Sequence, residues 1–314
     1  MKHKKLEIPE ILDGKRADIA ICKLLGNELS RNQVKDLIKS GDILINDERC
    51  KPKDKVCHND EIDVSIPDAE VSSWTAEDID VDVIFACDDY SIINKPAGLV
   101  MHPGAGVKSG TLANAVSKFY PEVLSLPRNG IVHRLDKDTS GLVVIARNNG
   151  FRNHIAEQFQ NREVEKKYLA VIKGEILGAL TINKPIARDR QNRTKMKVDE
   201  SGREAISEAI SLESFDGYSL VEVRIETGRT HQIRVHLSSN KTPIIGDKTY
   251  GSGSQLIKNL SEDLKDKILS FPRQALHAYQ LAFLDASNNM QVYKSDLPDD
   301  ILGLVESLKS NEYA

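Results

Sequence analysis

The sequence of 314 residues has little cysteine, few aromatic residues and no long apolar run. Its four cysteines form no Cys-x-x-Cys pair, which excludes a disulfide framework and a zinc knuckle and indicates free thiols in a reducing compartment. No stretch approaches the roughly 18 apolar residues that a membrane span needs. The N-terminus is basic but lacks the apolar core of a signal peptide, so we expect a cytoplasmic protein without a membrane partner.

Positive charge is missing from one segment. No Lys or Arg lies between Lys55 and Lys95, although the whole chain is nearly balanced at a net charge of −4. The middle of this segment, residues 67–80, is acidic and has no apolar period, which predicts a linker between two domains. We therefore expect a small domain over residues 12–66 and a larger domain over residues 81–310.

The first domain is predicted to be a compact α/β module. Short strands at 43–45 and 62–66 follow a helix whose apolar stripe is Val34, Leu37 and Ile38. Arg31 and Lys35 lie on the opposite face of this helix, and the chain up to Lys55 holds 13 basic and 10 acidic residues. Such a face is either solvated or in contact with the phosphates of a nucleic acid.

The second domain mixes strands and helices. Apolar runs at 141–146 and 168–172 predict buried strands, and Phe151, Ile155 and Phe159 mark an amphipathic helix between them. Alternation over 218–227 predicts a strand of an antiparallel sheet, and a final helix begins near Pro298.

The densest charged cluster is the segment His133-Arg-Leu-Asp-Lys-Asp-Thr-Ser-Gly141, directly before the strand at 141–146. Unpaired charges are costly away from water, so the segment is either a surface turn or a functional site. It differs from a protein-kinase catalytic loop, because Leu135 separates Arg134 from Asp136 and no glycine-rich phosphate loop precedes it.

A second cluster covers residues 226–237. Thr230 is predicted to cap a helix that presents Arg234 in a fixed direction, as bidentate pairing with a carboxylate requires. His231 and His236 lack the spacing of helical metal ligands, so we expect structural histidines rather than a metal site.

A third cluster is the basic run over 184–203, with seven basic and three acidic side chains. Alternation would place Arg193, Lys195 and Lys197 on one side of a strand. A two-stranded ribbon with such a face fits the phosphates of a nucleic acid, whereas a solvated hairpin is the alternative.

Four segments of the chain together form a recognisable series of motifs: Asn94–Ala105, His133–Gly141, Lys166–Ala170 and Thr227–His236. In order and spacing they resemble the motifs of the RluA family of RNA pseudouridine synthases, and residues 271–277 continue the match. The N-terminal module is similar to the small RNA-binding domain first described in a ribosomal small-subunit protein. Together with residues 102–106 it most resembles the RluD branch, whose members modify large-subunit ribosomal RNA.

This resemblance implies an α+β pseudouridine synthase fold, with a mixed, mainly antiparallel central sheet and flanking helices behind the small α/β domain. It implies isomerisation of uridine in RNA, and the expected RNA is large-subunit ribosomal RNA or its assembly intermediate. No cofactor or metal is expected. Asp136 matches the catalytic aspartate, which either attacks C1′ or removes the 2′ proton. Arg234 matches the arginine that pairs with it. Tyr168 matches the tyrosine that stacks on the base and takes the C5 proton, for which its hydroxyl needs a basic neighbour.

We expect a monomer, since no exposed heptad or large apolar surface helix occurs. Two other functions stay open: a non-catalytic RNA-binding factor with the same fold, and a carboxylate hydrolase of small nucleosides. The set of Asp136, Tyr168 and Arg234 argues against the first, and the basic ribbon argues against the second. The candidate RNA contacts are Arg31, Lys35, Arg134, Arg188, Arg190, Arg193, Lys195, Lys197 and Arg229.

Overall fold

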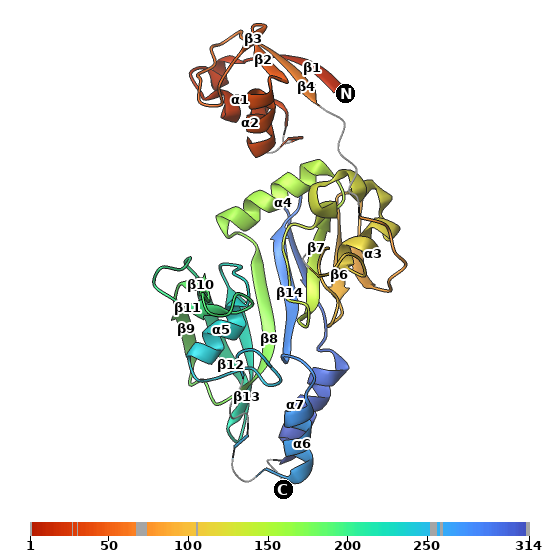
Figure 1. Cartoon of the computed structure of the whole chain (residues 1–314), viewed down its shortest axis with the longest axis vertical. Helices are drawn as coiled ribbons and strands as arrows, with labels where there is room; N and C mark the ends of the chain where they lie inside the picture. Colours follow the sequence, from red (N-terminus) through yellow and green to blue (C-terminus); the bar gives the residue numbers. More distant parts are fainter. Residues whose placement is uncertain are drawn as a thin grey trace.

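The computed structural model describes residues 2–26, 28–29, 31–66, 74–104, 106–251, 256–257 and 260–311. Its N-terminal module is a four-stranded sheet of order β1-β4-β2-β3 beside two helices (Figure 1). The apolar stripe predicted for the second helix packs inward, with Val34 and Ile38 buried. The elements are β1 (Lys2–Glu7), η1 (Glu10–Leu12), α1 (Ala17–Leu24), α2 (Arg31–Ser40), β2 (Ile43–Ile45), β3 (Glu48–Arg49) and β4 (Glu61–Ile66).

Strand β1 lies ahead of residue 12, where the sequence analysis started the module. It pairs with β4 along its whole length, from Lys2 opposite Ile66 to Glu7 opposite Glu61. Its sequence, Lys-His-Lys-Lys-Leu-Glu, has one apolar residue, so backbone pairing rather than a buried face forms this strand. Of the predicted acidic linker, residues 67–73 lie outside the described residues, and residues 74–80 form neither helix nor strand.

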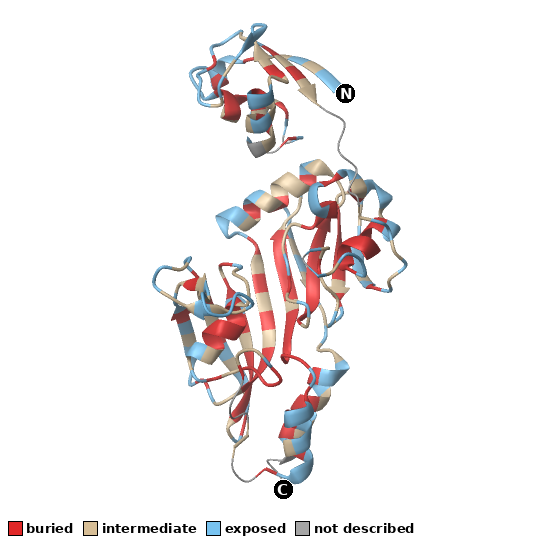
Figure 2. Ribbon diagram, in the orientation of Figure 1, coloured by how far each residue is buried: buried red, intermediate tan, exposed pale blue. Residues whose placement is uncertain are grey.

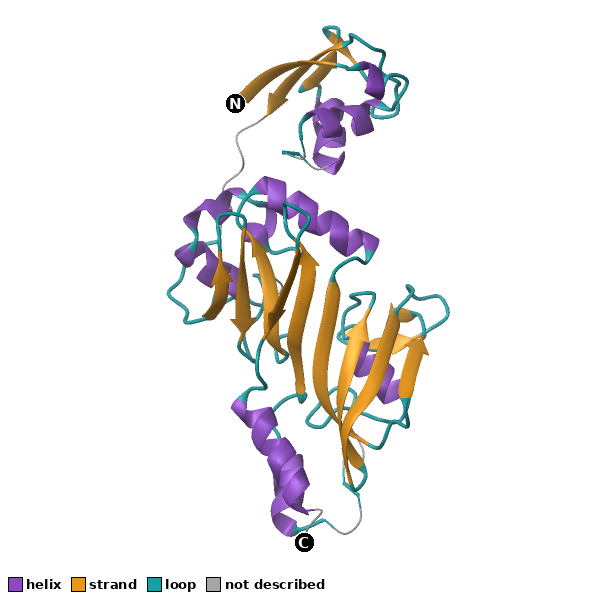
Figure 3. Ribbon diagram, turned by 180° about the vertical axis from the view of Figure 1, so that it is seen from behind, coloured by secondary structure: helices purple, strands orange, loops and turns teal. Residues whose placement is uncertain are grey.

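One long sheet runs through the second domain (Figure 3). Its order is β5-β6-β7-β14-β8-β13-β12-β9, with β15 beside β14. The contact between β7 and β14 is parallel and the other pairings are antiparallel, which confirms the predicted mixed, mainly antiparallel sheet. The strands are β5 (Asp82–Ala86), β6 (Tyr90–Lys95), β7 (Ser140–Ala146), β8 (Glu165–Lys173), β9 (Ala179–Asn183), β12 (Ile206–Phe215), β13 (Tyr218–Ile225), β14 (Leu276–Leu284) and β15 (Met290–Lys294).

Helices flank this sheet, and a separate two-stranded ribbon pairs β10 (Ile186–Arg188) with β11 (Met196–Val198). The predicted helices around Phe151 and after Pro298 are confirmed as α4 and α7. Among the described residues, no helix combines the length and apolar character that crossing a membrane requires. The helical elements are α3 (Leu112–Phe119), η2 (Pro121–Ser125), η3 (Pro127–Gly130), α4 (Asn149–Asn161), α5 (Gln232–Ser239), α6 (Glu262–Ser270) and α7 (Asp299–Asn311).

The central strands are the most buried part of the domain (Figure 2). Every residue of β7 is buried, as its uninterrupted apolar run predicts. In β14, His277 lies opposite both Ser140 of β7 and Leu169 of β8. The loop that ends at Ser140 therefore lies at the same end of the sheet as Tyr168.

Candidate active site

The loop before β7 carries Asp136 and is held by its neighbours in the sequence. Leu135 is buried in the main core. The Val144 N–H donates to His133 Nε2 at 2.9 Å, and the His133 ring stacks on Phe159. Burial, with the charge of Lys166, lowers the pKa of His133 to about 3, so this ring is a neutral structural acceptor.

Two buried cations hold the backbone that follows Asp136. Lys95 is fully buried at the end of β6, and its Nζ donates to the carbonyl oxygens of Pro96, Leu99 and Lys137 at 2.8, 2.9 and 3.0 Å. Arg273 Nη1 donates to the Asp138 carbonyl oxygen at 3.2 Å. The carbonyls of the two residues after Asp136, Lys137 and Asp138, are thus fixed by side chains from distant segments.

Lys95 had no predicted role, although it lies in the motif Asn94–Ala105. The available signal was its position after the apolar run Ile92-Ile93, in a strand too buried to leave an ammonium group in water. Burial and the charge of Arg273 lower the pKa of Lys95 to about 7, against the opposing charges of Asp138 and Asp136.

Helix α5 presents Arg234, but it begins differently from the prediction. His231, not Thr230, is the N-cap residue, and its left-handed φ of 56° leaves no side-chain cap. The Gln232 side chain takes over: its Oε1 accepts from the Arg229 N–H at 3.0 Å, and its Nε2 donates to the Ile206 carbonyl at 2.8 Å. The helix start is therefore tied to β12, which fixes the direction of Arg234.

Arg234 joins two carboxylates. Its Nη1 donates to Asp136 Oδ2 at 3.0 Å, and its Nε and Nη2 make a bidentate pair with Asp247 at 2.8 and 2.9 Å. The guanidinium side chain is 7% exposed. Burial lowers the pKa of Arg234, but the two carboxylates outweigh it and the net shift is upward, which keeps the charge fixed.

Asp247 was missed by the sequence analysis. It follows Gly246, whose φ of +74° and close approach to the Arg273 carbonyl leave no room for a side chain. The Thr249 and Tyr250 N–H groups donate to Asp247 Oδ1 at 2.9 and 3.0 Å. Burial raises the pKa of Asp247, but the hydrogen bonds and charge of Arg234 lower it by more. The net shift is downward, so Asp247 stays ionised behind Arg234. A Gly-Asp pair directly after a buried apolar run was the available signal.

His231 belongs to the site rather than to the structural core alone. Its Nε2 lies 3.9 Å from Asp136 Oδ1, and its Nδ1 is 2.8 Å from the Tyr250 hydroxyl oxygen. That hydroxyl also accepts from the Met196 N–H at 2.8 Å, so Tyr250 connects β11 of the ribbon to the neighbourhood of Asp136. His236 is structural, as predicted, between the Ser207 hydroxyl and the Lys184 carbonyl. In the described ranges, no three His, Cys, Asp or Glu side chains gather closely enough to hold a metal ion.

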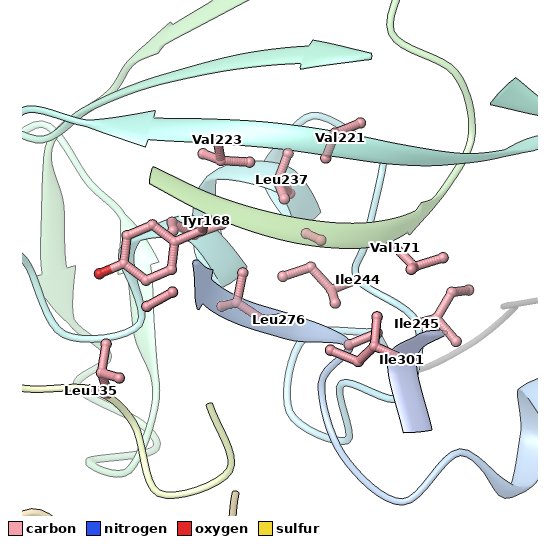
Figure 4. Packing of buried hydrophobic residues seen from close by; sticks show 14 of the residues in the cluster. Leu135, Tyr168, Val171, Val221, Val223, Leu237, Ile244, Ile245, Leu276 and Ile301 are labelled. Atoms are coloured by element: carbon pink, nitrogen blue, oxygen red, sulfur yellow. The ribbon is translucent and has the colours of Figure 1, made fainter. Parts of the chain in front are cut away.

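Tyr168 and Lys166 point to the same face of β8. Tyr168 packs among Leu135 and Leu276 with its hydroxyl directed away from the aliphatic core (Figure 4). Burial and the charge of Asp136 raise its pKa, so the phenol stays protonated at neutral pH. Burial lowers the pKa of Lys166 to about 8, which makes Lys166 a basic group of the kind that a proton-accepting Tyr168 requires.

Asp136, Tyr168 and Arg234 line one cavity of about 620 Å³, which is large enough for a nucleoside. Of the nine candidate RNA contacts, Arg134 and Arg229 line it as well. Further basic side chains that the sequence analysis did not single out complete its wall; they are His102, Arg128, Arg162 and Lys166.

The basic ribbon exists, but its charges are arranged differently from the prediction. Arg193 lies in the turn between β10 and β11, so it cannot alternate with Lys195 and Lys197 along one strand. Asn192 forms this turn by accepting from the Thr194 N–H and hydroxyl. Lys197 also pairs with Asp199 at 3.0 Å. Arg188, Arg190 and Arg193 remain exposed.

In the N-terminal module, Arg31 and Lys35 share one acidic partner. Asp18 on α1 is fully buried, and Arg31 Nη2 lies 2.9 Å and Lys35 Nζ 3.8 Å from its Oδ2. Arg16 pairs with the same carboxylate at 3.0 Å. Burial raises the pKa of Asp18, but the hydrogen bonds from Arg16 and Arg31 lower it by more, so the net shift is downward. These cations therefore tie α2 to α1, and only part of their charge faces solvent.

Comparison with known proteins agrees with this architecture. Residues 89–239 match the family model described as RNA pseudouridylate synthase, and residues 13–62 match the S4 domain. The chain is 38% identical over 305 residues to ribosomal large subunit pseudouridine synthase D of Xanthomonas campestris, covering 97% of this chain and 92% of the relative. It is 36% identical over 300 residues to the protein of that name from Escherichia coli K12, covering 95% and 92%.

A solved structure also matches. Human RNA pseudouridylate synthase domain containing 4 aligns with a TM-score of 0.58 and 26% identity, over 73% of this chain and 93% of the human chain. The aligned fold, the two matched domains and the identity to curated relatives lead to one conclusion. The chain belongs to the RluA family of RNA pseudouridine synthases, in its RluD branch with an N-terminal S4 domain.

Proposed function

We propose that this enzyme converts specific uridines of large-subunit ribosomal RNA to pseudouridine, with Asp136 acting at the ribose. The observation that carries the proposal is the contact of Asp136 with Arg234 in a cavity of nucleoside size. The names of the relatives from Xanthomonas campestris and Escherichia coli support the choice of RNA. The ribosomal substrate also leads us to propose that the enzyme works in the cytoplasm, and we propose that it does so as a monomer.

The reaction breaks the N1–C1′ bond, turns the uracil while it is held, and joins C5 to C1′. C5 loses a proton and N1 gains one, so no atom or electron enters or leaves overall. The target base has to leave its stack to reach the cavity, at a cost of a few kcal/mol that contacts to the RNA backbone must offset.

In this proposal Asp136 is the ionised carboxylate that the first step needs, either to attack C1′ or to remove the 2′ proton. Both routes require a charged, oriented oxygen, and Arg234 supports this by hydrogen bonding to one oxygen of Asp136. Asp247 fixes Arg234 from behind and does not line the cavity, so we assign it a positioning role.

We assign the base side of the cavity to Tyr168 and Lys166. The aromatic face of Tyr168 suits a uracil that turns in its plane. The phenol keeps its proton at neutral pH, so removal of the C5 proton needs a partner base. Lys166, with a pKa of about 8, has a neutral fraction near physiological pH and is our candidate for that base.

Mapping of pseudouridines in total RNA, with and without the gene, tests the proposal. We expect defined uridines of large-subunit ribosomal RNA to lose the modification, and the wild-type gene to restore it. A gene carrying Asp136→Asn should yield a folded protein that binds the RNA without modifying it. Restored modification by this variant, or an unchanged map without the gene, would contradict the proposal, and the second result would favour a non-catalytic RNA-binding factor.

A further inference from the structure

Three consecutive residues just before the Asp136 loop have left-handed backbone. Arg128, Asn129 and Gly130 have φ values of 55°, 51° and 75°. Glycine tolerates this region freely and asparagine moderately, whereas an arginine pays about 1–2 kcal/mol of strain there. A Cβ on Gly130 would lie 2.0 Å from the Ala146 carbonyl oxygen, so the close approach to β7 explains the glycine. It does not explain an arginine two residues earlier.

A buried side chain enforces the strained turn. Asn129 is fully buried, and its Nδ2 donates to Ser117 Oγ at 2.5 Å. Backbone bonds close the turn on both sides, from Asn129 N–H to the Leu126 carbonyl and from Ile131 N–H to the Arg128 carbonyl. The turn leaves Arg128 exposed at the wall of the active-site cavity, where a flexible loop would not hold it.

Several cations lie near Arg128, and within the described ranges none of them forms an ion pair with a carboxylate. Arg128, Arg134 and His102 line the same cavity, and Arg152 of α4 has a buried Nε without a hydrogen-bond partner among the described residues. Burial and the charges of Arg134 and Arg128 lower the pKa of His102, and burial and the charge of Arg128 lower that of Arg152. Among the residues that the structure describes, no carboxylate forms an ion pair with Arg128, Arg134 or Arg152.

Arg162 shows the opposite arrangement in the same cavity. It also has left-handed backbone, with φ of 65°, and it also lines the cavity wall. Its guanidinium, however, pairs with Glu204 at 2.5 Å. The cavity therefore has two arginines with strained backbone: Arg162 has a carboxylate partner, and Arg128 has none among the described residues.

We propose that Arg128, supported by Arg152, is a phosphate-binding site at the mouth of the cavity that holds an RNA backbone phosphate next to the flipped uridine. Guanidinium groups match phosphate oxygens in geometry, and an anion would offset the mutual repulsion of these cations. The inference rests on the proposed function, since it names the RNA group that the cavity wall recognises.

Binding of a stem-loop RNA that contains a mapped target uridine tests this site. The measurement uses the Asp136→Asn protein, so that no turnover occurs. Arg128→Gly removes the side chain and relieves the backbone strain, so we expect an unchanged or higher melting temperature with about tenfold weaker RNA binding. The slope of log affinity against log salt should fall by about one. Arg162→Gly is the matched control, and we expect it to change RNA affinity less than twofold.

A set of RNAs with single methylphosphonate linkages identifies the phosphate. The loss caused by Arg128→Gly should disappear on the RNA that lacks one charge beside the target uridine, and persist on the others. An equal loss on every RNA would point to a general field or a free-anion site and would overturn the proposal, as would an equal loss in Arg162→Gly. If the wild-type chain made no pseudouridine while this pattern held, the proposed function would fail and the phosphate site would stand.

Discussion

Arginine side chains are arranged in opposite ways in the candidate active site and on the basic surfaces outside it. Arg234 is 7% exposed and bound by two carboxylates, whereas Arg188 and Arg193 of the ribbon region are exposed and form no ion pair within the described residues. Buried pairs have fixed geometry and resist screening by salt, while exposed charges act at longer range and weaken with salt. Substitutions at the buried pairs around Arg234 should therefore affect catalysis, and substitutions on the exposed basic surfaces should affect the affinity for RNA.

Among residues that do not line the cavity, the largest effect is expected at Asp247. Asp247→Asn leaves Arg234 with Asp136 as its one charged partner, so we expect kcat to fall about 100-fold with RNA affinity within about twofold. Urea unfolding should show a loss of about 2–4 kcal/mol in the free energy of unfolding. Asp199→Asn, in a partly exposed pair with Lys197 away from the cavity, is the control and should leave kcat unchanged. An unaltered kcat in Asp247→Asn would refute a positioning role.

The buried Lys166 should make stability depend on pH. Its folded pKa of about 8 lies below the ordinary value of 10.5, so the unfolded chain binds the additional proton between these values. Lys166 should therefore add up to about 3 kcal/mol to the free energy of unfolding as the pH rises from about 8 to 10.5. Lys166→Met should reduce the rise by this amount and leave the part due to Lys95, whereas Lys167→Met, at a half-buried neighbour, should retain the full rise. Equal slopes for wild type and Lys166→Met in pH-dependent urea unfolding would contradict the assignment.

Ribbon charges should affect RNA affinity and its salt dependence without affecting chemistry. Reversing Arg193 and Lys195 to glutamate should weaken RNA binding about tenfold at low salt. The slope of log affinity against log salt should fall by about two. Lys197→Glu should have a smaller effect, since Asp199 already neutralises Lys197. Fluorescence anisotropy at several salt concentrations measures both. An unchanged slope in the double variant would show that the ribbon does not contact RNA.

Among the candidate RNA contacts, the smallest effect on RNA binding is expected at Arg31. Because Arg31 is held by the buried Asp18, Arg31→Ala should reduce RNA affinity less than about threefold and lower the stability of the N-terminal module by about 1 kcal/mol. Lys39→Ala, farther along the same helix and away from Asp18, is the comparison, and should leave stability within about 0.5 kcal/mol. A tenfold affinity loss in Arg31→Ala would restore its role as a direct RNA contact.

Local pattern was sufficient to predict several elements. The apolar run that forms β7 and the amphipathic periods that form α4 and α7 are confirmed, because burying a continuous face dominates in each of them. Strand β1 escaped prediction for the converse reason: hydrogen bonds to β4 form it, and its side chains are mostly exposed.

The start of α5 and the course of the ribbon show where pattern fails. Thr230 is a good cap by residue type, but the left-handed His231 and the side-chain bonds of Gln232 form the helix start instead. Arg193 fits a strand by alternation, but the turn formed around Asn192 removes it from the strand. In both places, hydrogen bonds of neighbouring polar side chains outweigh the periodic signal.

By itself the sequence determined the family and several of the elements, and it singled out Asp136, Tyr168 and Arg234 as candidates, because these lie in contiguous segments whose spacing and local chemistry can be followed along the chain. Only the tertiary structure decided that Asp247 stands behind Arg234, that Lys95 holds the backbone beside Asp136, and that Asp18 draws Arg31 and Lys35 together. Each of these contacts joins segments that are far apart in the chain or on different elements. The buried charges there find partners through the packing of the fold, which no local pattern encodes.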